Sequence, residues 1–262
     1  MPEGHTVHRL AMDHTKWLAG KRLGVSSPQG RFEVGAQLLS GKSLKTVEAH
    51  GKHLYYTFSS ELVLHVHLGL YGKFRLYESP PPEPRGAVRI RFVGKTHTLD
   101  LNGPNQCEIL SSKQVRDSRS KLGEDPLRSD ADPERVWARI QRSKQPVGQL
   151  LLDQSVVAGI GNIYRAEILF LLKIHPSRPS CSLTRNEFDD LWQTSLRLLA
   201  IGVKYNRIIT VDRDETDKPL SRLSSDERLL IYKKERCPRC QSTTETWLLG
   251  NRQMFACSVC QV

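Results

Sequence analysis

The pattern of hydrophobic and polar residues has two different periodicities along the chain. Between residues 3 and 19 apolar side chains recur every three or four positions, which predicts a helix that stops at Gly20. The face of this helix comprises Val7, Leu10, Ala11, His14 and Leu18. From Lys21 the apolar residues form short alternating runs, which predict strands separated by turns. The predicted strands cover residues 44–47, 54–58, 62–68, 74–77 and 88–93.

The alternation is clearest in residues 88–92. We expect Val88, Ile90 and Phe92 to point inward and the two arginines between them, Arg89 and Arg91, to point outward. Several short strands at this spacing predict a β-sandwich of roughly 110 residues, preceded by one helix. The proline-rich residues 79–86 have predicted strands on both sides, so we interpret them as a loop within this domain.

The second half of the chain has a helical pattern. Alternation stops in the polar stretch 111–131, and Asp132-Pro133 then has the form of an N-cap followed by proline in the first turn. Further sequence patterns predict helices at 133–142, 147–153, 162–172 and 184–204, followed by an exposed polar connector at 206–227. We therefore predict an α+β fold, with a catalytic β-sandwich domain at 1–115, a linker at 116–130, a helical domain at 131–227 and a small C-terminal unit at 228–262.

A glycine-containing turn, residues 157–162, joins the second and third of these helices. Backbone N–H groups at the start of the helix that begins at Asn162 would suit a phosphate. A tight helix connection without a ligand is the alternative.

The six cysteines fall into two classes. Four of them form two pairs with two residues between the partners, a spacing typical of a structural zinc site. These are Cys237, Cys240, Cys257 and Cys260. A ribbon of this size has too small a core to fold without its metal, so we expect one structural Zn²⁺ and no other cofactor. Cys107 and Cys181 are isolated, and we interpret them as buried small apolar residues.

Charge narrows the class of partner. The chain has 39 Lys and Arg against 28 Asp and Glu, a formal net charge of +11. Such a balance favours a polyanion, here nucleic acid, although solubility alone would also explain it. No apolar run approaches the ~20 residues of a membrane span, and the N-terminus lacks the pattern of a signal peptide. We expect a soluble intracellular protein with no membrane partner.

The first four residues, Met1-Pro2-Glu3-Gly4, carry candidate covalent chemistry. If Met1 is removed, Pro2 presents a secondary amine beside the carboxylate of Glu3. Because an α-amino group has a pKa near ~8, part of it is unprotonated at neutral pH and can act as a nucleophile. An ordinary disposable terminus is the alternative. While Met1 is attached, Pro2 is an amide and is not nucleophilic.

Four separated motifs together resemble the bifunctional DNA glycosylases of the formamidopyrimidine-DNA glycosylase and endonuclease VIII family. They are Pro2-Glu3-Gly4, His50-Gly51-Lys52, the segment 159–164, and the cysteine quartet with Arg252 near a hairpin tip. The resemblance covers essentially the whole chain. It implies a helix-two-turns-helix in the helical domain and a zinc ribbon, or zinc finger, at the C-terminus.

The resemblance also implies roles for individual residues. Pro2, Glu3 and Lys52 would be catalytic, with Pro2 attacking C1′ of the damaged nucleoside. Asn162 and Arg252 would clamp backbone phosphates. The implied partner is damaged DNA, whether duplex, single-stranded or bubble. The implied protein is a monomer in the bacterial cytoplasm, associated with the nucleoid.

A flipped-out nucleotide leaves a gap in the stack, and Leu70 and Tyr71 are the candidates to fill it. A core pair at the end of a strand is the alternative. His65 and His67 share a strand face, but the sequence shows no third metal ligand beside them. We therefore interpret these histidines as packing or phosphate-contact residues.

An absent motif indicates which branch of the family the chain resembles. Residues 101–107 lack the Arg-Phe-Gly wedge of the formamidopyrimidine branch, whereas Leu70-Tyr71 looks like the endonuclease VIII branch, which favours oxidised pyrimidines as substrates. Gly69 and His5-Thr6 depart from the common pattern of that branch, which leaves the preferred opposite base open. A non-catalytic binder of damaged DNA and a zinc-ribbon transcription or translation factor are the rival interpretations.

Overall fold

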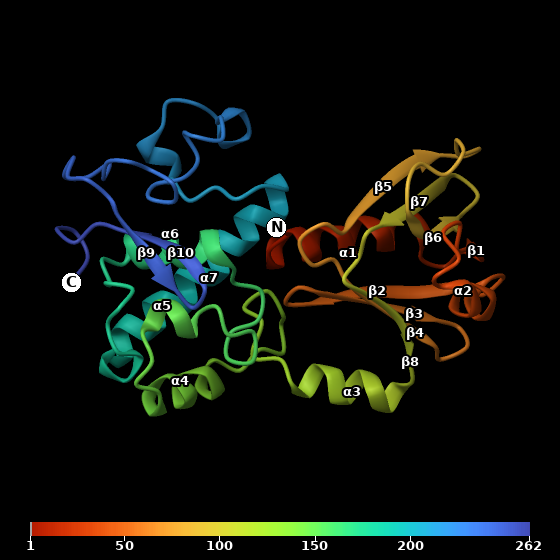
Figure 1. Cartoon of the computed structure of the whole chain (residues 1–262), viewed down its shortest axis with the longest axis horizontal. Helices are drawn as coiled ribbons and strands as arrows, with labels where there is room; N and C mark the ends of the chain where they lie inside the picture. Colours follow the sequence, from red (N-terminus) through yellow and green to blue (C-terminus); the bar gives the residue numbers. More distant parts are fainter. Residues whose placement is uncertain (1) are drawn as a thin grey trace. The chain divides into compact units, whose positions relative to one another are not determined.

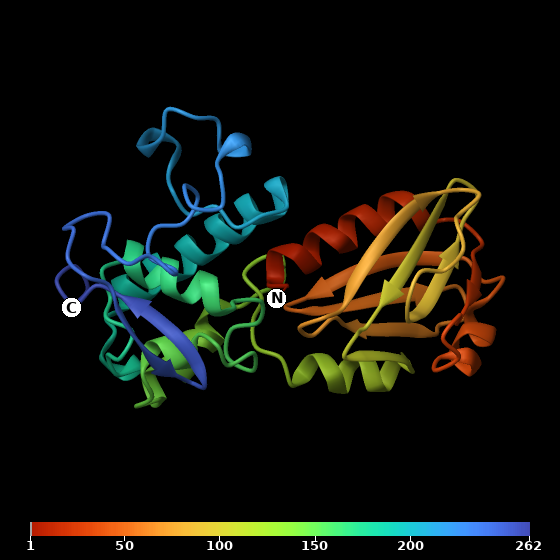
Figure 2. The same ribbon diagram turned by 45° about the horizontal axis from the view of Figure 1, so that its top comes forward.

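The computed structural model describes residues 2–262, which form two compact units (Figures 1 and 2). The first unit contains Pro2, Glu3 and residues 7–121, and the second contains Gly4–Thr6 and Leu122–Val262. Within the described residues, no helix has the length and apolar character needed to cross a membrane.

The first unit is a β-sandwich of two antiparallel four-stranded sheets. One sheet has the order β1 (Gly24–Ser26), β6 (Val88–Val93), β7 (His97–Asn102) and β5 (Lys73–Glu78). The other has the order β2 (Leu44–His50), β3 (His53–Phe58), β4 (Val63–His67) and β8 (Gln106–Leu110). Helix α1 (Gly4–Leu18) contributes Val7, Ala11 and Leu18 to the core that the sheets enclose, and α2 (Glu33–Leu39) contributes Ala36 and Leu39.

All five predicted strands and the leading helix are confirmed. In β6, Val88, Ile90 and Phe92 are buried as expected. The expectation that Arg91 points into solvent is wrong: Arg91 is buried and donates to both carboxylate oxygens of Asp100 on β7, at 2.6 and 2.8 Å. A buried guanidinium is tolerated here because a bidentate carboxylate compensates its charge.

The polar stretch after β8 is partly helical. Residues that we expected to end the first domain and begin the linker form α3 (Ser112–Ser120). Ser111 and Gln114 make a capping box at its start. The helix lies along β8, and Val115 packs against Tyr55, Val63 and Leu110 on the outer face of the second sheet (Figure 1).

The second unit is built around α6 (Asn162–Leu171), which is buried on nearly every side. Helix α6 contacts α5 (Val147–Leu150), α7 (Arg185–Tyr205) and β10 (Arg252–Ala256), which pairs with β9 (Glu245–Leu249) in a hairpin. The unit also contains α4 (Pro133–Arg142) and the short 3₁₀ turns η1 (Ser180–Ser182), η2 (Arg213–Glu215) and η3 (Leu220–Arg222). The predicted helices are confirmed, although α5 ends three residues before its expected limit. Asp132 caps α4 by accepting from the backbone N–H of Glu134 at 3.0 Å.

The two isolated cysteines differ from expectation. Cys107 and Cys181 are only partly buried, so neither is a fully enclosed core residue. The surroundings still raise the pKa of Cys107 to about 12, chiefly through burial of its thiol. A thiol of this kind is mostly unreactive at neutral pH.

Candidate functional site

The N-terminal motif lies at the head of α1. Pro2 is partly buried, and Glu3 is the buried N-cap residue, with 2% of its surface exposed. In the second unit, the N–H of Gly4 donates to the carbonyl of Gly159 at 2.8 Å. A Cβ atom on Gly4 would approach the Gly159 Cα to 2.8 Å, so only glycine fits at this position. Met1 lies outside the described residues.

Lys52 belongs to the first unit and lies in the tight turn between β2 and β3. The flanking residues His50 and His53 are paired across the two strands, and Gly51 has a φ of +57°, which glycine adopts at low cost. The Lys52 side chain is partly exposed at this turn. The turn therefore presents an ammonium group at one end of the second sheet.

Histidines gather at the same end of that sheet. Sequence inspection found no third partner for His65 and His67, but His53 lies next to both of them. Its Nδ1 is 2.8 Å from Nε2 of His65, and its ring centroid is 4.6 Å from that of His67. His65 Nδ1 lies 3.0 Å from Oε1 of Glu108. This neighbour is set by the antiparallel pairing of β3 with β4, which places His53 opposite His67 and which the sequence alone leaves open.

Burial and the repulsion of nearby positive charge favour the neutral forms of His53 and His67. Burial lowers the pKa of His53 to about 3, assisted by the positive charge that His67, His65, His50 and Lys52 would place nearby. Burial, with repulsion from His65 and Lys52, also lowers the pKa of His67. Among residues 2–262 only the cysteine quartet gathers three or more ligand atoms closely enough for a metal. The interpretation of His65 and His67 as something other than metal ligands is therefore retained.

Leu70 and Tyr71 are surface residues. They lie in the turn after β4, which is closed by the N–H of Gly72 donating to the carbonyl of Leu68 at 2.9 Å. Their side chains are 55% and 81% exposed. The alternative that they form a core pair at a strand end is therefore wrong. Gly69 has a φ of +65°, which suits the sharp turn.

Asn162 and Arg252 are joined by a residue that the sequence did not single out. Arg165 is fully buried and donates to Oδ1 of Asn162 at 2.8 Å and to the carbonyl of Arg252 at 3.2 Å. It also donates to the carbonyls of Gly148 and Leu249, at 2.9 and 3.0 Å. Asn162 Nδ2 donates to the Gln253 carbonyl at 2.9 Å.

These bonds fix the orientation of the Asn162 amide and the backbone position of Arg252. The Asn162 amide can have only one orientation, because its oxygen faces a donor and its nitrogen faces an acceptor. One N–H of that amide is left for a ligand. The Arg252 side chain is exposed at the start of β10 while Arg165 holds its backbone. The sequence feature that could have indicated Arg165 is its position as a charged residue in an otherwise apolar helical run.

Glu167, two residues further on α6, is a second buried charge that sequence reasoning missed. Its carboxylate accepts from the backbone N–H groups of Leu230, Ile231 and Tyr232, at 2.7–2.9 Å, and from the hydroxyl of Thr210. Because Thr210 lies near the start of the polar connector (residues 206–227) and Leu230 follows its end, Glu167 ties the two ends of that connector together.

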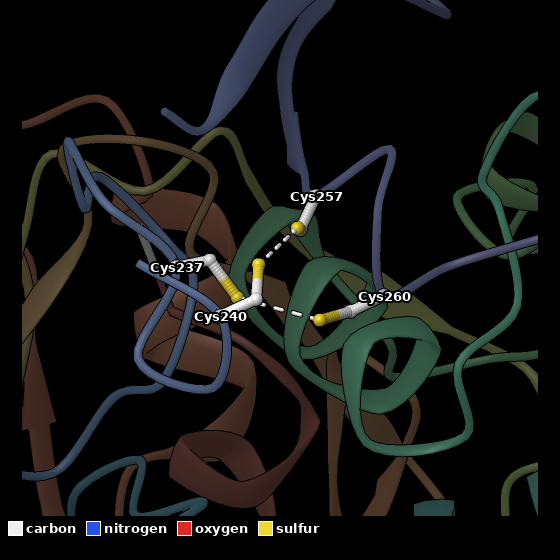
Figure 3. Close-up of side chains that lie close together, drawn as sticks. All are labelled: Cys237, Cys240, Cys257 and Cys260. Atoms are coloured by element: carbon white, nitrogen blue, oxygen red, sulfur yellow. Dashed lines mark hydrogen bonds between the residues drawn. The ribbon is translucent and has the colours of Figure 1, made fainter. Parts of the chain in front are cut away.

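The side chains of the four cysteines predicted to bind metal converge (Figure 3). Their sulfur atoms all lie within 4.8 Å of one another, with Cys237 to Cys260 at 3.8 Å and Cys240 to Cys257 at 3.5 Å. Tetrahedral Zn–S bonds of about 2.3 Å separate their sulfurs by about 3.8 Å, so the arrangement fits a four-thiolate ion. The hydroxyl of Ser242 lies 2.9 Å from Cys240 Sγ and 3.2 Å from Cys257 Sγ, where it can donate to a thiolate.

Comparison with known proteins identifies relatives over the whole length. Residues 1–107 match the model for the formamidopyrimidine-DNA glycosylase N-terminal domain, and residues 122–214 match the formamidopyrimidine-DNA glycosylase H2TH domain. The chain is 45% identical to "Endonuclease 8 1" of Mycobacterium tuberculosis over 268 residues, which cover 100% of both chains. It is 31% identical to the formamidopyrimidine-DNA glycosylase of Laribacter hongkongensis, covering 100% of this chain and 98% of that one.

A solved structure has the same fold. The Lactococcus lactis Fpg, determined in complex with DNA that contains an abasic site, matches with a TM-score of 0.82. The match covers 99% of each chain at 24% sequence identity. At this identity the likeness establishes the fold and nothing further.

Proposed function

Since the chain belongs to the formamidopyrimidine-DNA glycosylase family of DNA repair enzymes, and within it to the endonuclease VIII branch, we propose that it is a bifunctional DNA glycosylase and AP lyase. It would excise oxidised bases, with pyrimidines preferred, and then cut the strand by elimination. The observation that carries this proposal is the pair Pro2–Glu3 at the head of α1, ahead of the first helical residue.

The proposed chemistry begins once Met1 has been removed. The Pro2 nitrogen attacks C1′ of the damaged nucleoside, and the glycosidic bond breaks as the base departs with a proton. The C1′–O4′ bond of the sugar then opens, with a proton delivered to O4′, and because the amine is secondary a cationic iminium remains at C1′. That charge acidifies the C2′ proton, whose removal expels the phosphate at C3′. Glu3 assists opening of the sugar ring and transfers protons, because its carboxyl adjoins the nucleophile in the chain.

The remaining roles concern the DNA strand. Lys52 holds a phosphate and stabilises charge in the reacting complex, for which its partly exposed position at a turn is suitable. Asn162 and Arg252 clamp backbone phosphates next to the lesion. The single orientation of the Asn162 amide and the exposed guanidinium of Arg252 support this assignment.

The wedge role belongs to Leu70 and Tyr71. A base must leave the duplex to be excised, and an apolar or aromatic side chain then fills the gap. The exposure of both side chains supports this role, since neither is needed in the core.

We place the protein in the bacterial cytoplasm, acting as a monomer on duplex, single-stranded or bubble DNA.

Zinc is the proposed ion of the cysteine quartet. When bound, it supplies no chemistry to the reaction but fixes the ribbon that carries Arg252. The sulfur–sulfur distances of 3.8 and 3.5 Å support zinc over a disulfide, because a disulfide would bring two sulfurs to about 2.05 Å.

Borohydride trapping tests the covalent step. Hydride reduces the iminium and leaves the protein permanently attached to DNA that contains an abasic site. We expect trapping by wild-type protein whose intact mass confirms loss of Met1, and a large loss of trapping in Pro2→Gly. Arg252→Ala serves as a matched control, because it should weaken binding and still trap at saturating DNA.

The rival interpretation gives the opposite result. If correctly processed protein binds abasic DNA but is never trapped, the lyase proposal is wrong and the protein is a non-catalytic binder of damaged DNA. If it excises an oxidised pyrimidine no faster than an oxidised purine, the preference proposed for its substrates is wrong. A panel of lesions in single- and double-stranded DNA provides that comparison.

A further inference from the structure

Glu108, His65 and His53 form a continuous hydrogen-bonded chain across β8, β4 and β3. A carboxylate offers only acceptors, so Nδ1–H of His65 must donate to Oε1 of Glu108, at 3.0 Å. The Nε2 atom of neutral His65 then carries a lone pair. That lone pair can only accept, and the atom 2.8 Å away is Nδ1 of His53. One carboxylate therefore determines the tautomers of two histidines.

The outcome is a defined lone pair on His53, whose ring lies within electrostatic reach of Lys52. With its Nδ1–H donating to His65, neutral His53 has an unprotonated Nε2. His53 directly follows Lys52, and its ring stacks on that of His67. The catalytic steps proposed for Pro2, Glu3 and Lys52 make no use of this arrangement. His65 is buried and half of Glu108 is exposed, so the chain runs from the surface, through the sheet face, to the turn.

The charged and titratable groups around His53 make its protonation depend on a ligand. His50 faces it from β2, Lys52 from the turn, and His65 and His67 from β4. Together with burial they lower its pKa to about 3. Glu108 on β8 is the carboxylate on this path, and it stabilises an imidazolium through His65. A phosphate has the opposite effect to the surrounding cations, because an adjacent anion favours the protonated form.

We propose that His53 binds a DNA strand phosphate beside Lys52 as an imidazolium, so that DNA binding takes up one proton at Nε2. The proton comes from solvent, and the positive charge is shared along His53, His65 and Glu108 without breaking any bond between heavy atoms. This site rests on the proposed function, since it assigns a phosphate of the same DNA. His65 and Glu108 are positioning residues, because they act only through His53.

Calorimetry measures the proton directly. DNA with an uncleavable tetrahydrofuran abasic site is titrated into the protein at pH 6.5 in two buffers that differ in ionisation enthalpy. We expect wild-type protein to take up about one proton, with affinity falling by up to about tenfold per pH unit as pH rises. In His53→Gln the uptake should disappear. In Glu108→Gln it should fall, while the pH-independent part of the affinity remains. His97→Gln is the matched control, a histidine on β7 of the same unit whose ring stacks on Trp17.

Nitrogen NMR of the free protein tests the tautomers without DNA. The proposal requires an unprotonated Nε2 and a protonated Nδ1 on His53, and a mixture of tautomers in Glu108→Gln. A proton on His53 Nε2 in the free wild-type protein at neutral pH overturns it. Binding without proton uptake, or uptake that persists in His53→Gln, overturns this proposal and leaves the proposed function standing. Failure to bind damaged DNA at all overturns both.

Discussion

Arg165 is a buried cation whose partners are mainly backbone carbonyls from distant parts of the second unit. One of them belongs to α5, one to the end of β9 and one to Arg252, and the fourth acceptor is the Asn162 side chain. A guanidinium suits this position because it has five donors in a rigid plane. The residue therefore positions both members of the proposed phosphate clamp, Asn162 and Arg252, without itself reaching the surface.

Replacing Arg165 by lysine should weaken DNA binding even though the charge is kept. A lysine ammonium has only three N–H donors, all on one nitrogen, so it cannot bond to all four acceptors. The hairpin that carries Arg252 would therefore shift. We expect a loss of about tenfold or more, the worth of one charged hydrogen bond. The slope of log Kd against log salt should fall by about one, as it should in Arg252→Ala, because each variant loses a phosphate contact.

The double variant separates positioning from general destabilisation. If Arg165 acts through Arg252, combining the two changes should cost little more than the worse single change. Fully additive losses, or an unchanged salt slope in Arg165→Lys, would contradict that role. Arg178→Lys is the matched control: Arg178 makes a bidentate pair with Glu187 in the same unit, at 2.6 and 2.8 Å, and should affect stability alone.

At the scale of elements, the zinc ribbon consists of a two-stranded hairpin held at its base by thiolates. Only five residue pairs join β9 and β10, which is marginal for an isolated hairpin in water. A metal held by the four cysteines would supply the missing stability. Removal by a strong chelator should therefore lower the melting temperature and reduce DNA affinity at least tenfold, since Arg252 begins β10.

Metal content gives the direct measurement. We expect one zinc per wild-type chain and close to none in Cys257→Ser. Cys181→Ser is the control because Cys181 lies outside the quartet, and it should keep both metal and affinity. A chelated protein that melts and binds DNA like the untreated one would show that the quartet is not a structural metal site.

The sequence predicts elements best where one face is apolar. Strands β2–β6 and helices α6 and α7 follow from the sequence pattern, and α4 follows from its Asp132-Pro133 start. Strand β7 does not, because its buried positions include the polar residues Thr98, Asp100 and Asn102. A carboxylate such as Asp100 is expected at the surface, and only the structure shows that Arg91 compensates its charge in the interior. Helix α3 has no buried residue of its own, so its polar sequence resembles a linker.

The same physical reason limits prediction of the candidate site. The cysteine quartet is predictable because its ligands are close in sequence and chemically distinctive. The link from Arg165 to Arg252 is not, because the acceptor is a backbone carbonyl, which every residue possesses. The chain from Glu108 to His53 depends on strand register, which a single sequence leaves open.

At the scale of the whole molecule, buried histidines should govern stability near neutral pH. Burial lowers the pKa of His14 to about 3, and burial together with the charge of Arg228 lowers that of His5 to about 4. His53 and His67 are shifted in the same direction. These groups stay neutral in the folded protein and bind protons in the unfolded chain below its ordinary pKa of about 6.5.

Stability should therefore rise with pH between 5 and 6.5 and level off above that. In this window the unfolded state binds more protons than the folded state, so the free energy of unfolding increases with pH. His14 is fully enclosed, with its Nδ1 at 2.7 Å from the Tyr56 hydroxyl, and should alone contribute about 2 kcal/mol over this interval.

Urea unfolding at several pH values, followed by near-ultraviolet circular dichroism, measures the slope of the unfolding free energy against pH. His14→Phe should flatten it whatever its effect on absolute stability, because phenylalanine cannot titrate, whereas His97→Gln should leave most of it. A slope unchanged by His14→Phe, or stability that increases towards pH 5, would show that His14 is not held neutral in the folded protein.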